Sequence, residues 1–165
     1  MNALGVTLDD KTSPIRLEDL EKVAGQVDET DLELLPFFEE EAGAEIKKIE
    51  SILHAWHANS VGSPLDDLRL QFHTLKGAAN CVGQLRIGSL AGGMKDVLDS
   101  ITTAEAFALR SELTKTSIMV LELIRVLLKE AHSPQYNPAK KEQILKGVHA
   151  LLDLRKKTDA LKPRP

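Results

Sequence analysis

Cysteine, aromatic residues and long apolar runs are all scarce in this chain of 165 residues. Cys81 is the only cysteine, so no disulfide can form within the chain, and the disulfide framework of a small secreted domain is excluded. No apolar run approaches the ~20 residues that a membrane-spanning helix needs, and the sequence does not open on a signal-peptide pattern. We therefore expect a cytoplasmic protein that binds no membrane, with Cys81 reduced and packed rather than reactive.

The chain also lacks an excess of basic charge and any recognised phosphate-binding loop. The formal net charge is −4, and no basic stripe with interleaved aromatic residues runs along the chain, which excludes a typical nucleic-acid surface. Neither G-x-x-x-x-G-K-[ST] nor G-x-G-x-x-G occurs, so the chain has no recognised device for binding ATP. His54, His57 and His149 belong to no Cys/His cluster and no His-Glu-x-x-His pattern, so we expect surface histidines, no metal site and no cofactor.

What the chain does contain is helical periodicity. Leu, Ala, Glu and Lys dominate, apolar residues make up 42% of the chain, and no alternating strand pattern appears. Periodicity and punctuation predict five main helices, over about 32–58, 64–83, 85–101, 102–131 and 138–158. The expected fold class is all-α: an antiparallel four-helix bundle of the first four segments, an additional C-terminal helix packed alongside, and a short N-terminal helix near 15–27.

The chain should divide into four parts: a disordered N-terminal segment, the bundle with its short N-terminal helix, a linker with the fifth helix, and a linker-like tail. Their expected ranges are 1–13, 14–131, 132–158 and 159–165. The first long helix should follow a cap at Asp31, with Leu34 on its buried side. Thr102 and Glu105 have capping-box spacing and predict the start of one unbroken helix with Phe107 on its apolar stripe.

The run Phe72–Gly83, F-H-T-L-K-G-A-A-N-C-V-G, is the most informative part of the chain. As a helix it carries an apolar seam at spacings of three and four, formed by Leu65, Leu68, Phe72, Leu75, Ala79 and Val82. A second stripe at the same periodicity is formed by Arg69, His73, Lys76, Gly77 and Asn80. We interpret the second stripe as an open functional face, because nothing in it helps to fill a core.

The residue types on this face suit phosphoryl chemistry at a histidine. The ordinary histidine pKa is about 6.5, so a neutral imidazole that can attack phosphorus is available at neutral pH. Lys76 stands three residues after His73, within reach of the charge that gathers on the oxygens of a transferred phosphoryl group. Gly77 costs a helix about 1 kcal/mol against alanine, which is understandable if another molecule must approach closely there.

This run also resembles the signature of histidine-containing phosphotransfer (HPt) domains, in which His-x-x-Lys-Gly frames the phosphorylated histidine. The resemblance covers roughly residues 30–130. Within the family, the sequence is most similar to the N-terminal phosphotransfer domain of chemotaxis-type histidine kinases. The resemblance implies an HPt-like bundle with His73 as phosphoacceptor, Lys76 facing the phosphoryl group and Gly77 leaving room for the partner. It also implies a domain that is monomeric in isolation, with a response-regulator receiver domain or a kinase catalytic domain as partner and Mg²⁺ in the receiver only.

One position departs from the chemotaxis pattern. Many chemotaxis-kinase domains carry a glutamate twenty-two residues after the histidine, on the next helix and hydrogen-bonded to the ring. Lys95 occupies that position here, with Asp96 beside it. A lysine cannot accept a hydrogen bond from an imidazole N–H, so the departure argues against a chemotaxis-type kinase more than against exchange with a response regulator.

A partner is expected to dock around this histidine, on a surface formed by Arg69, Gly77, Asn80, Gly88, Gly92 and Lys95. The three glycines at 88, 92 and 93 can be interpreted in two ways: they permit close helix packing, or they flatten the surface for a partner. Two functions compete. One is a phosphorelay intermediate that passes a phosphoryl group through His73; the other is a non-phosphorylated docking or scaffold module with the same fold, which Lys95 favours. A four-helix phosphatase is a distant third, because no acidic or amide group is evidently placed to orient water.

Overall fold

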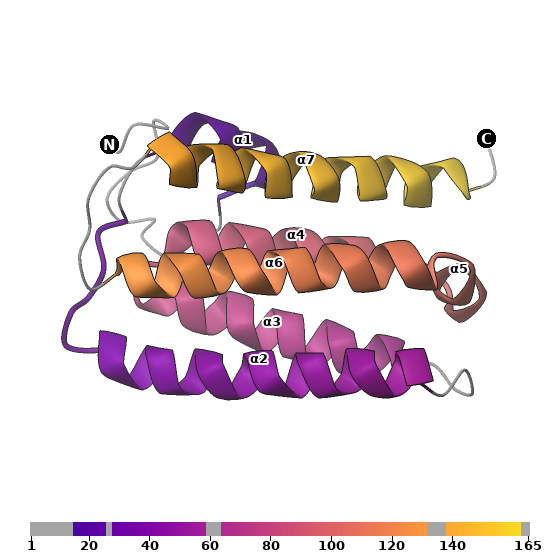
Figure 1. The fold of residues 1–165 in the computed structure, drawn as a ribbon, viewed down its shortest axis with the longest axis horizontal. Helices are drawn as coiled ribbons and strands as arrows, with labels where there is room; N and C mark the ends of the chain where they lie inside the picture. Colours follow the sequence, from indigo (N-terminus) through magenta and orange to yellow (C-terminus); the bar gives the residue numbers. More distant parts are fainter. Residues whose placement is uncertain (1–14, 26–27, 59–63, 132–137, 163–165) are drawn as a thin grey trace.

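The computed structural model describes residues 15–25, 28–58, 64–131 and 138–162. Within these ranges the chain forms seven helices and no strand, so the expected all-α class is confirmed (Figure 1). The helices are α1 (Leu17–Val23), α2 (Leu35–Ala58), α3 (Leu65–Cys81), α4 (Leu85–Asp99), α5 (Thr103–Ala108), α6 (Arg110–Glu130) and α7 (Pro138–Ala160). None of these helices is both long and apolar enough to cross a bilayer.

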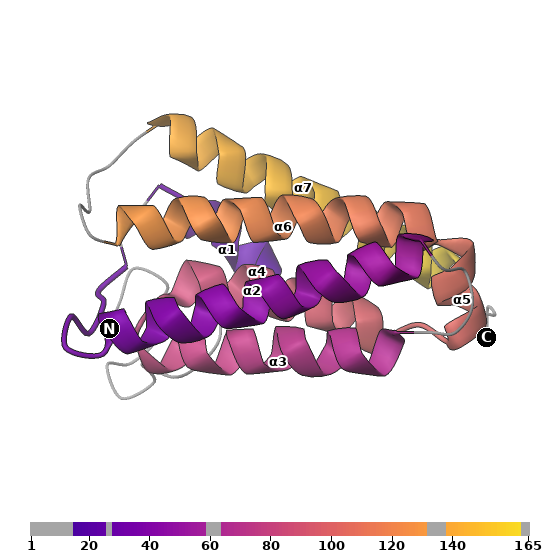
Figure 2. The ribbon, with the colours of Figure 1, turned by 60° about the horizontal axis from the view of Figure 1, so that its bottom comes forward.

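Helices α2, α3, α4 and α6 form the bundle, and α1 and α7 pack against it. The closest pairs are α3 with α4 and α2 with α3, and the two views in Figures 1 and 2 show α2 and α3 running together along one side. The Asp31 amide donates to the Val82 carbonyl at 2.9 Å. The segment just before α2 therefore lies beside the residue just after α3, as expected of two antiparallel helices. The predicted bundle with an additional C-terminal helix is therefore correct.

The apolar seams predicted from spacing fill this core. On α2 the buried positions recur every three or four residues, as expected of a helix with one face in a core, and they include Phe38, Ala42, Ile46, Ile49, Leu53 and Trp56. On α3 the seam of Leu65, Leu68, Phe72, Leu75 and Ala79 is buried throughout. The burial of this seam fixes the rotation of α3 and thereby turns the opposite side of the helix, with His73, toward solvent.

Helix α4 is the central element, because α1, α3, α6 and α7 all contact it. Small residues make this possible: a side chain on Gly93 would press on Leu17 of α1 at 3.2 Å and on Leu151 of α7 at 3.4 Å. Helix α1 is held here by the buried side chains of Leu17, Leu20 and Val23, as predicted for a short N-terminal helix. Helices α1 and α7 thus cover one side of α4, while α3 covers another.

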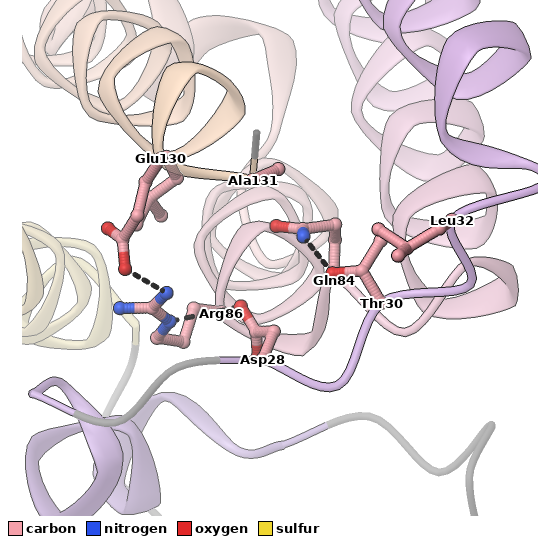
Figure 3. Close-up of a pocket in the computed structure, with 8 residues that line it drawn as sticks. Asp28, Thr30, Leu32, Gln84, Arg86, Glu130 and Ala131 are labelled. Atoms are coloured by element: carbon pink, nitrogen blue, oxygen red, sulfur yellow. Dashed lines mark hydrogen bonds and ion pairs between the residues drawn. The ribbon is translucent and has the colours of Figure 1, made fainter. Parts of the chain in front are cut away.

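A buried ion cluster closes one end of the molecule (Figure 3). Arg86 of α4 donates to Asp28, in the segment between α1 and α2, and to Glu130 at the end of α6, each at 3.0 Å. Lys140 of α7 approaches the second oxygen of Glu130 at 3.6 Å. Burial raises the pKa of the Asp28 carboxyl despite the opposing attraction of Arg86. The cluster therefore joins four separate segments of the chain, with Arg86 pairing directly with Asp28 and Glu130 and with Lys140 attached through Glu130.

Helix α2 begins three residues later than predicted, at Leu35 instead of residue 32. Leu35 is 3% exposed and Leu34 is 44% exposed, so the expectation that Leu34 faces the core is wrong. The reason is Pro36, which has no N–H and is tolerated only in the first turn of a helix. Asp31 still acts as a local cap, because its Oδ1 accepts from the Glu33 amide at 3.0 Å.

The helix expected over 102–131 is broken into α5 and α6. Its predicted capping box is present: Glu105 N–H donates to Thr102 Oγ1 at 3.2 Å, and Thr102 N–H donates to Glu105 Oε1 at 3.0 Å. The backbone then leaves the helical region at Leu109, with φ −101° and ψ 16°. Phe107 is consequently 57% exposed, with the Arg110 guanidinium 5.6 Å from its ring, and its predicted place in the core is wrong.

The C-terminal helix extends to Ala160, slightly beyond the predicted end near residue 158. Lys162, just after it, pairs with Glu105 at 3.1 Å, so the start of the expected tail contacts α5. The predicted disorder of residues 1–13, the linker residues 132–137 and the last residues of the tail, 163–165, lie outside the described ranges.

Candidate functional site

His73 lies at the middle of α3 on its solvent-facing side. Gly77, one turn further along the same face, is exposed as well, and a Cβ placed on it would meet no atom within 4 Å. The imidazole therefore stands beside an open stretch of helix surface. A convex, uncovered histidine with bare backbone next to it is accessible to another protein, whereas a histidine at the bottom of a cleft would favour a small ligand.

Lys76 is half-buried and lies between α3 and α4. Its side chain crosses α4 at Gly92, where a Cβ would come within 3.2 Å of Cδ and 3.4 Å of Cε. Gly92 is itself buried beneath this chain. The lysine stem is thus packed against a helix, which is the usual arrangement of a long cationic side chain that keeps its charged end near solvent.

Arg69 is turned toward the end of α4. Its Nε and Nη2 donate to the carbonyls of Leu98 and Ile101, both at 2.8 Å, and its Nη1 pairs with Asp66 at 2.9 Å. The last carbonyls of a helix have no partner within the helix, so the guanidinium acts as a C-terminal cap for α4. The structure therefore gives Arg69 a structural task, while the docking role expected of it stays a prediction.

Asn80 is buried, at 8% exposure, so the expectation that its stripe lies wholly open is wrong at this position. Its side chain packs on Gly88 of α4: a Cβ there would come within 2.0 Å of Asn80 Oδ1. Gly88 and Gly92 are both buried beneath side chains of α3. Of the two readings left open for the α4 glycines, the structure favours close helix packing, and their predicted contact with a partner stays a prediction.

Lys95 lies on α4 at the level of His73. The pairs Asn80–Gly88, Lys76–Gly92 and Arg69–Leu98 fix the antiparallel register of α3 and α4, and the same register brings position 95 opposite position 73. The ammonium of Lys95 pairs with Asp99, one turn further along α4. Asp99 also approaches Arg69 Nε at 3.7 Å, so one carboxylate compensates two cations.

Cys81 is exposed at the end of α3, and the expectation that its thiol is packed is wrong. The helical period explains this, because residues 73, 77 and 81 are spaced by four and share one face. Sequence reasoning could have found this from the register of His73 and Gly77.

Two further residues of the site were not predicted. Asp99 was missed although Lys95 and Asp99 have the i,i+4 spacing of a helical ion pair. Leu70, three residues before His73, is 58% exposed. The sequence feature that could have identified it is an apolar residue within an otherwise polar stripe. Among the residues that the structure describes, no group of three or more His, Cys, Asp or Glu side chains converges as metal ligands would.

The fold and site together define a class: all-α bundles that hold a histidine, a lysine and a bare glycine on the open side of one helix. Residues 33–123 match the Hpt domain family, which covers more than half of the chain and runs from the turn before α2 into α6. The chain belongs to the Hpt domain family. Members of this family take part in histidine phosphotransfer in phosphorelays, where they interact with kinases and receiver domains. Comparisons with curated proteins and with solved structures gave no significant match. The closer likeness to chemotaxis-type kinases stays a prediction.

Proposed function

We propose that this protein is a phosphorelay intermediate in which His73 accepts a phosphoryl group and passes it to the aspartate of a response regulator. One observation carries the proposal. Of the histidines within the matched range, His54 and His57 lie exposed on α2, and His73 alone has a lysine three residues on and a bare glycine four residues on. Membership of the Hpt domain family supports the same chemistry.

The transfer step follows from the atoms available. The unprotonated ring nitrogen of His73 attacks phosphorus, and the P–N bond forms as the bond to the donor oxygen breaks. The leaving oxygen takes the bonding pair, as the carboxylate of a receiver domain or as ADP from a kinase. The Lys76 ammonium stabilises the charge on the phosphoryl oxygens, and any Mg²⁺ belongs to the acidic site of the partner.

The partner approaches over the open face of α3. The absent side chain at Gly77 and the exposed Leu70 one turn before His73 give a low, partly apolar surface on both sides of the imidazole. Such a surface suits a receiver domain, which must bring an aspartate within bonding distance of the ring. These 165 residues contain no nucleotide-binding loop, so the phosphoryl group must come from a receiver domain or a kinase catalytic domain.

The second candidate is a docking or scaffold module that keeps the fold without being phosphorylated. The observation that favours it is Lys95, at the level of His73, where the chemotaxis-type domains carry an acid. Lys95 is paired with Asp99, and an ammonium group attracts the oxygens of a phosphoryl group, so its presence does not oppose transfer. We therefore prefer phosphotransfer.

The test is incubation with a radiolabelled, aspartyl-phosphorylated receiver domain and Mg²⁺. We expect an acid-labile, base-stable label on the wild-type chain and none on His73→Gln, whose helical circular dichroism should match the wild type. His54→Gln and His57→Gln, exposed on α2, serve as controls and should keep the label. Label that persists on His73→Gln would refute the assignment, and a wild-type chain that binds the receiver without label would favour the scaffold.

A further inference from the structure

Gly92 belongs to α4, but the atoms nearest to its missing side chain belong to the reactive face of α3. A Cβ at this position would lie 3.2 Å from Cδ, 3.4 Å from Cε and 3.8 Å from Cγ of Lys76. All three are consecutive methylene carbons of the lysine stem. The stem therefore runs along the surface of α4 over the place that any other residue would fill.

This contact restricts a side chain that is otherwise flexible. Lysine is a point charge on a four-carbon stem with several rotatable bonds, and in solvent its ammonium samples a wide volume. Packing the stem against the backbone of α4 limits those conformers and keeps the Lys76 side chain in the plane between the two helices. His73 lies one turn before Lys76 on the same helix, where the Cβ atoms of residues three apart are about 5–6 Å from each other, so the restricted stem starts beside the imidazole.

The adjoining charges favour the same arrangement. Lys95 is one turn beyond Gly92 and carries the same sign as Lys76, but it pairs with Asp99, still further along α4. Asp99 in turn lies 3.7 Å from Arg69, so it is held at that end of the helix. The second ammonium is thereby drawn away from the position over Gly92.

We propose that Gly92 is a positioning residue for phosphotransfer: its missing side chain lets Lys76 lie where its charge meets the transferred phosphoryl group. The inference rests on the proposed function, since it assigns a role within that reaction. It also explains why a glycine is used in the middle of a buried helix, where alanine would be the better helix former.

The test compares two adjacent glycines of α4. In Gly92→Ala the lysine stem must give way by a few tenths of an ångström. Because a misplacement of about 1 Å can cost about a hundredfold in rate, we expect the maximal transfer rate to fall about 3- to 10-fold. The KM for the phosphorylated receiver should stay the same, because Lys76 acts on the transition state. Gly93→Ala is the matched control: its Cβ would meet side chains at similar distances, but they belong to Leu17 at 3.2 Å and Leu151 at 3.4 Å. Its transfer rate should stay within about twofold of the wild type.

A double-mutant cycle shows whether Gly92 acts through the lysine. In a Lys76→Ala background the clash is gone, so adding Gly92→Ala should change the rate no further. A Gly92→Ala rate equal to the wild type overturns the proposal, and so does equal slowing by Gly92→Ala with and without Lys76. A rise in KM alone would likewise overturn it, since that result indicates a docking contact.

Two further outcomes separate this inference from the proposed function. A wild-type chain that takes no label refutes both, whereas a labelled wild type with an unaffected Gly92→Ala refutes only the positioning role. A nuclear Overhauser contact between the Lys76 methylenes and the Gly92 α-protons is expected in the wild type. Its absence would overturn the positioning role even if Gly92→Ala were slow or poorly folded.

Discussion

His73, Lys76 and Gly77 lie within five consecutive positions of one helix, yet each has a different environment. His73 is exposed, Lys76 is half-buried against α4, and Gly77 borders empty space. These differences follow from the 100° step between successive helical residues, which turns neighbours to different sides. For the proposed transfer, this leaves the imidazole open to a partner, whereas the domain itself holds the lysine proposed to assist.

At this scale the prediction concerns Lys76. If its ammonium stabilises charge in the transition state, Lys76→Ala should slow phosphotransfer by roughly 10- to 1000-fold, a loss of about 1.4–4 kcal/mol from the barrier. Because the stem of Lys76 packs against α4, the free energy of unfolding should fall by about 1 kcal/mol, as is common for a single substitution that removes such packing. Rates are measured by rapid-quench transfer from a phosphorylated receiver. Lys47→Ala, an exposed lysine on α2, is the control, and equal rates for the two variants would contradict the assignment.

The motif residues could be predicted from the sequence because they lie within one helix, where spacing alone fixes which side chains share a face. Spacing within α3 could not show what α4 contributes. That Asn80 is buried on Gly88, that Arg69 caps α4 and that Lys76 lies over Gly92 all depend on how two helices approach one another. Such contacts require the register between helices, which no single periodicity contains.

At the scale of the element, the apolar seams identified the helices and their order, but two boundaries were wrong. A seam continues through Leu34 and through Phe107 if the helix is assumed to be straight. Pro36 forces the later start of α2, and the turn at Leu109 separates α5 from α6. Hydrophobic spacing reports which residues share a face, whereas helix ends depend on individual backbone groups.

The prediction for α3 as an element uses two open glycines. A Cβ added to Gly77 on α3 or to Gly43 on α2 would have no atom within 4 Å, so both positions tolerate a side chain. Gly77→Gln and Gly43→Gln should each raise the free energy of unfolding by several tenths of a kcal/mol, because glycine is the poorer helix former by up to about 1 kcal/mol. Urea unfolding measures this gain.

Only the change on α3 should impair function. A glutamine at Gly77 projects into the space that a receiver must occupy beside His73, so transfer and binding should both weaken, while Gly43→Gln should transfer normally. Titration calorimetry with the receiver domain measures the binding. If Gly77→Gln binds and transfers as well as Gly43→Gln, the partner approaches from another side and the expected docking surface on α3 is wrong.

At the scale of the whole molecule, α4 separates the helix that carries His73 from the helices that pack on the opposite side of the bundle. Gly92 faces Lys76, while Gly93 faces Leu17 and Leu151, so adjacent residues of one helix contact α3 on one side and α1 and α7 on the other. The buried Arg86 cluster then joins four segments at one end of the bundle. Stability should therefore depend on groups remote from His73, and pH should reveal them.

Asp28 provides that test, because burial raises its pKa above the ordinary 3.8. Between 3.8 and this raised pKa the folded state binds more protons at Asp28 than the unfolded state does, so the contribution of Asp28 to stability falls as the pH rises. Asp28→Asn cannot titrate but keeps an oxygen that can accept from Arg86. We expect the unfolding free energy of the wild type, minus that of Asp28→Asn, to decrease as the pH is raised from below 3.8.

Glu105 supplies a control of opposite sign. Hydrogen bonds from the Thr102 backbone and from Lys162 lower the pKa of Glu105 below its ordinary 4.5, so its stabilisation is present above that pH and is lost as the pH falls through the lowered value. The unfolding free energy of the wild type minus that of Glu105→Gln should therefore increase with rising pH. Urea titrations over the acid range measure both differences. If the Asp28 difference also increased with pH, the folded protein would hold Asp28 as a stabilised carboxylate, and attraction to Arg86 would outweigh the cost of its burial.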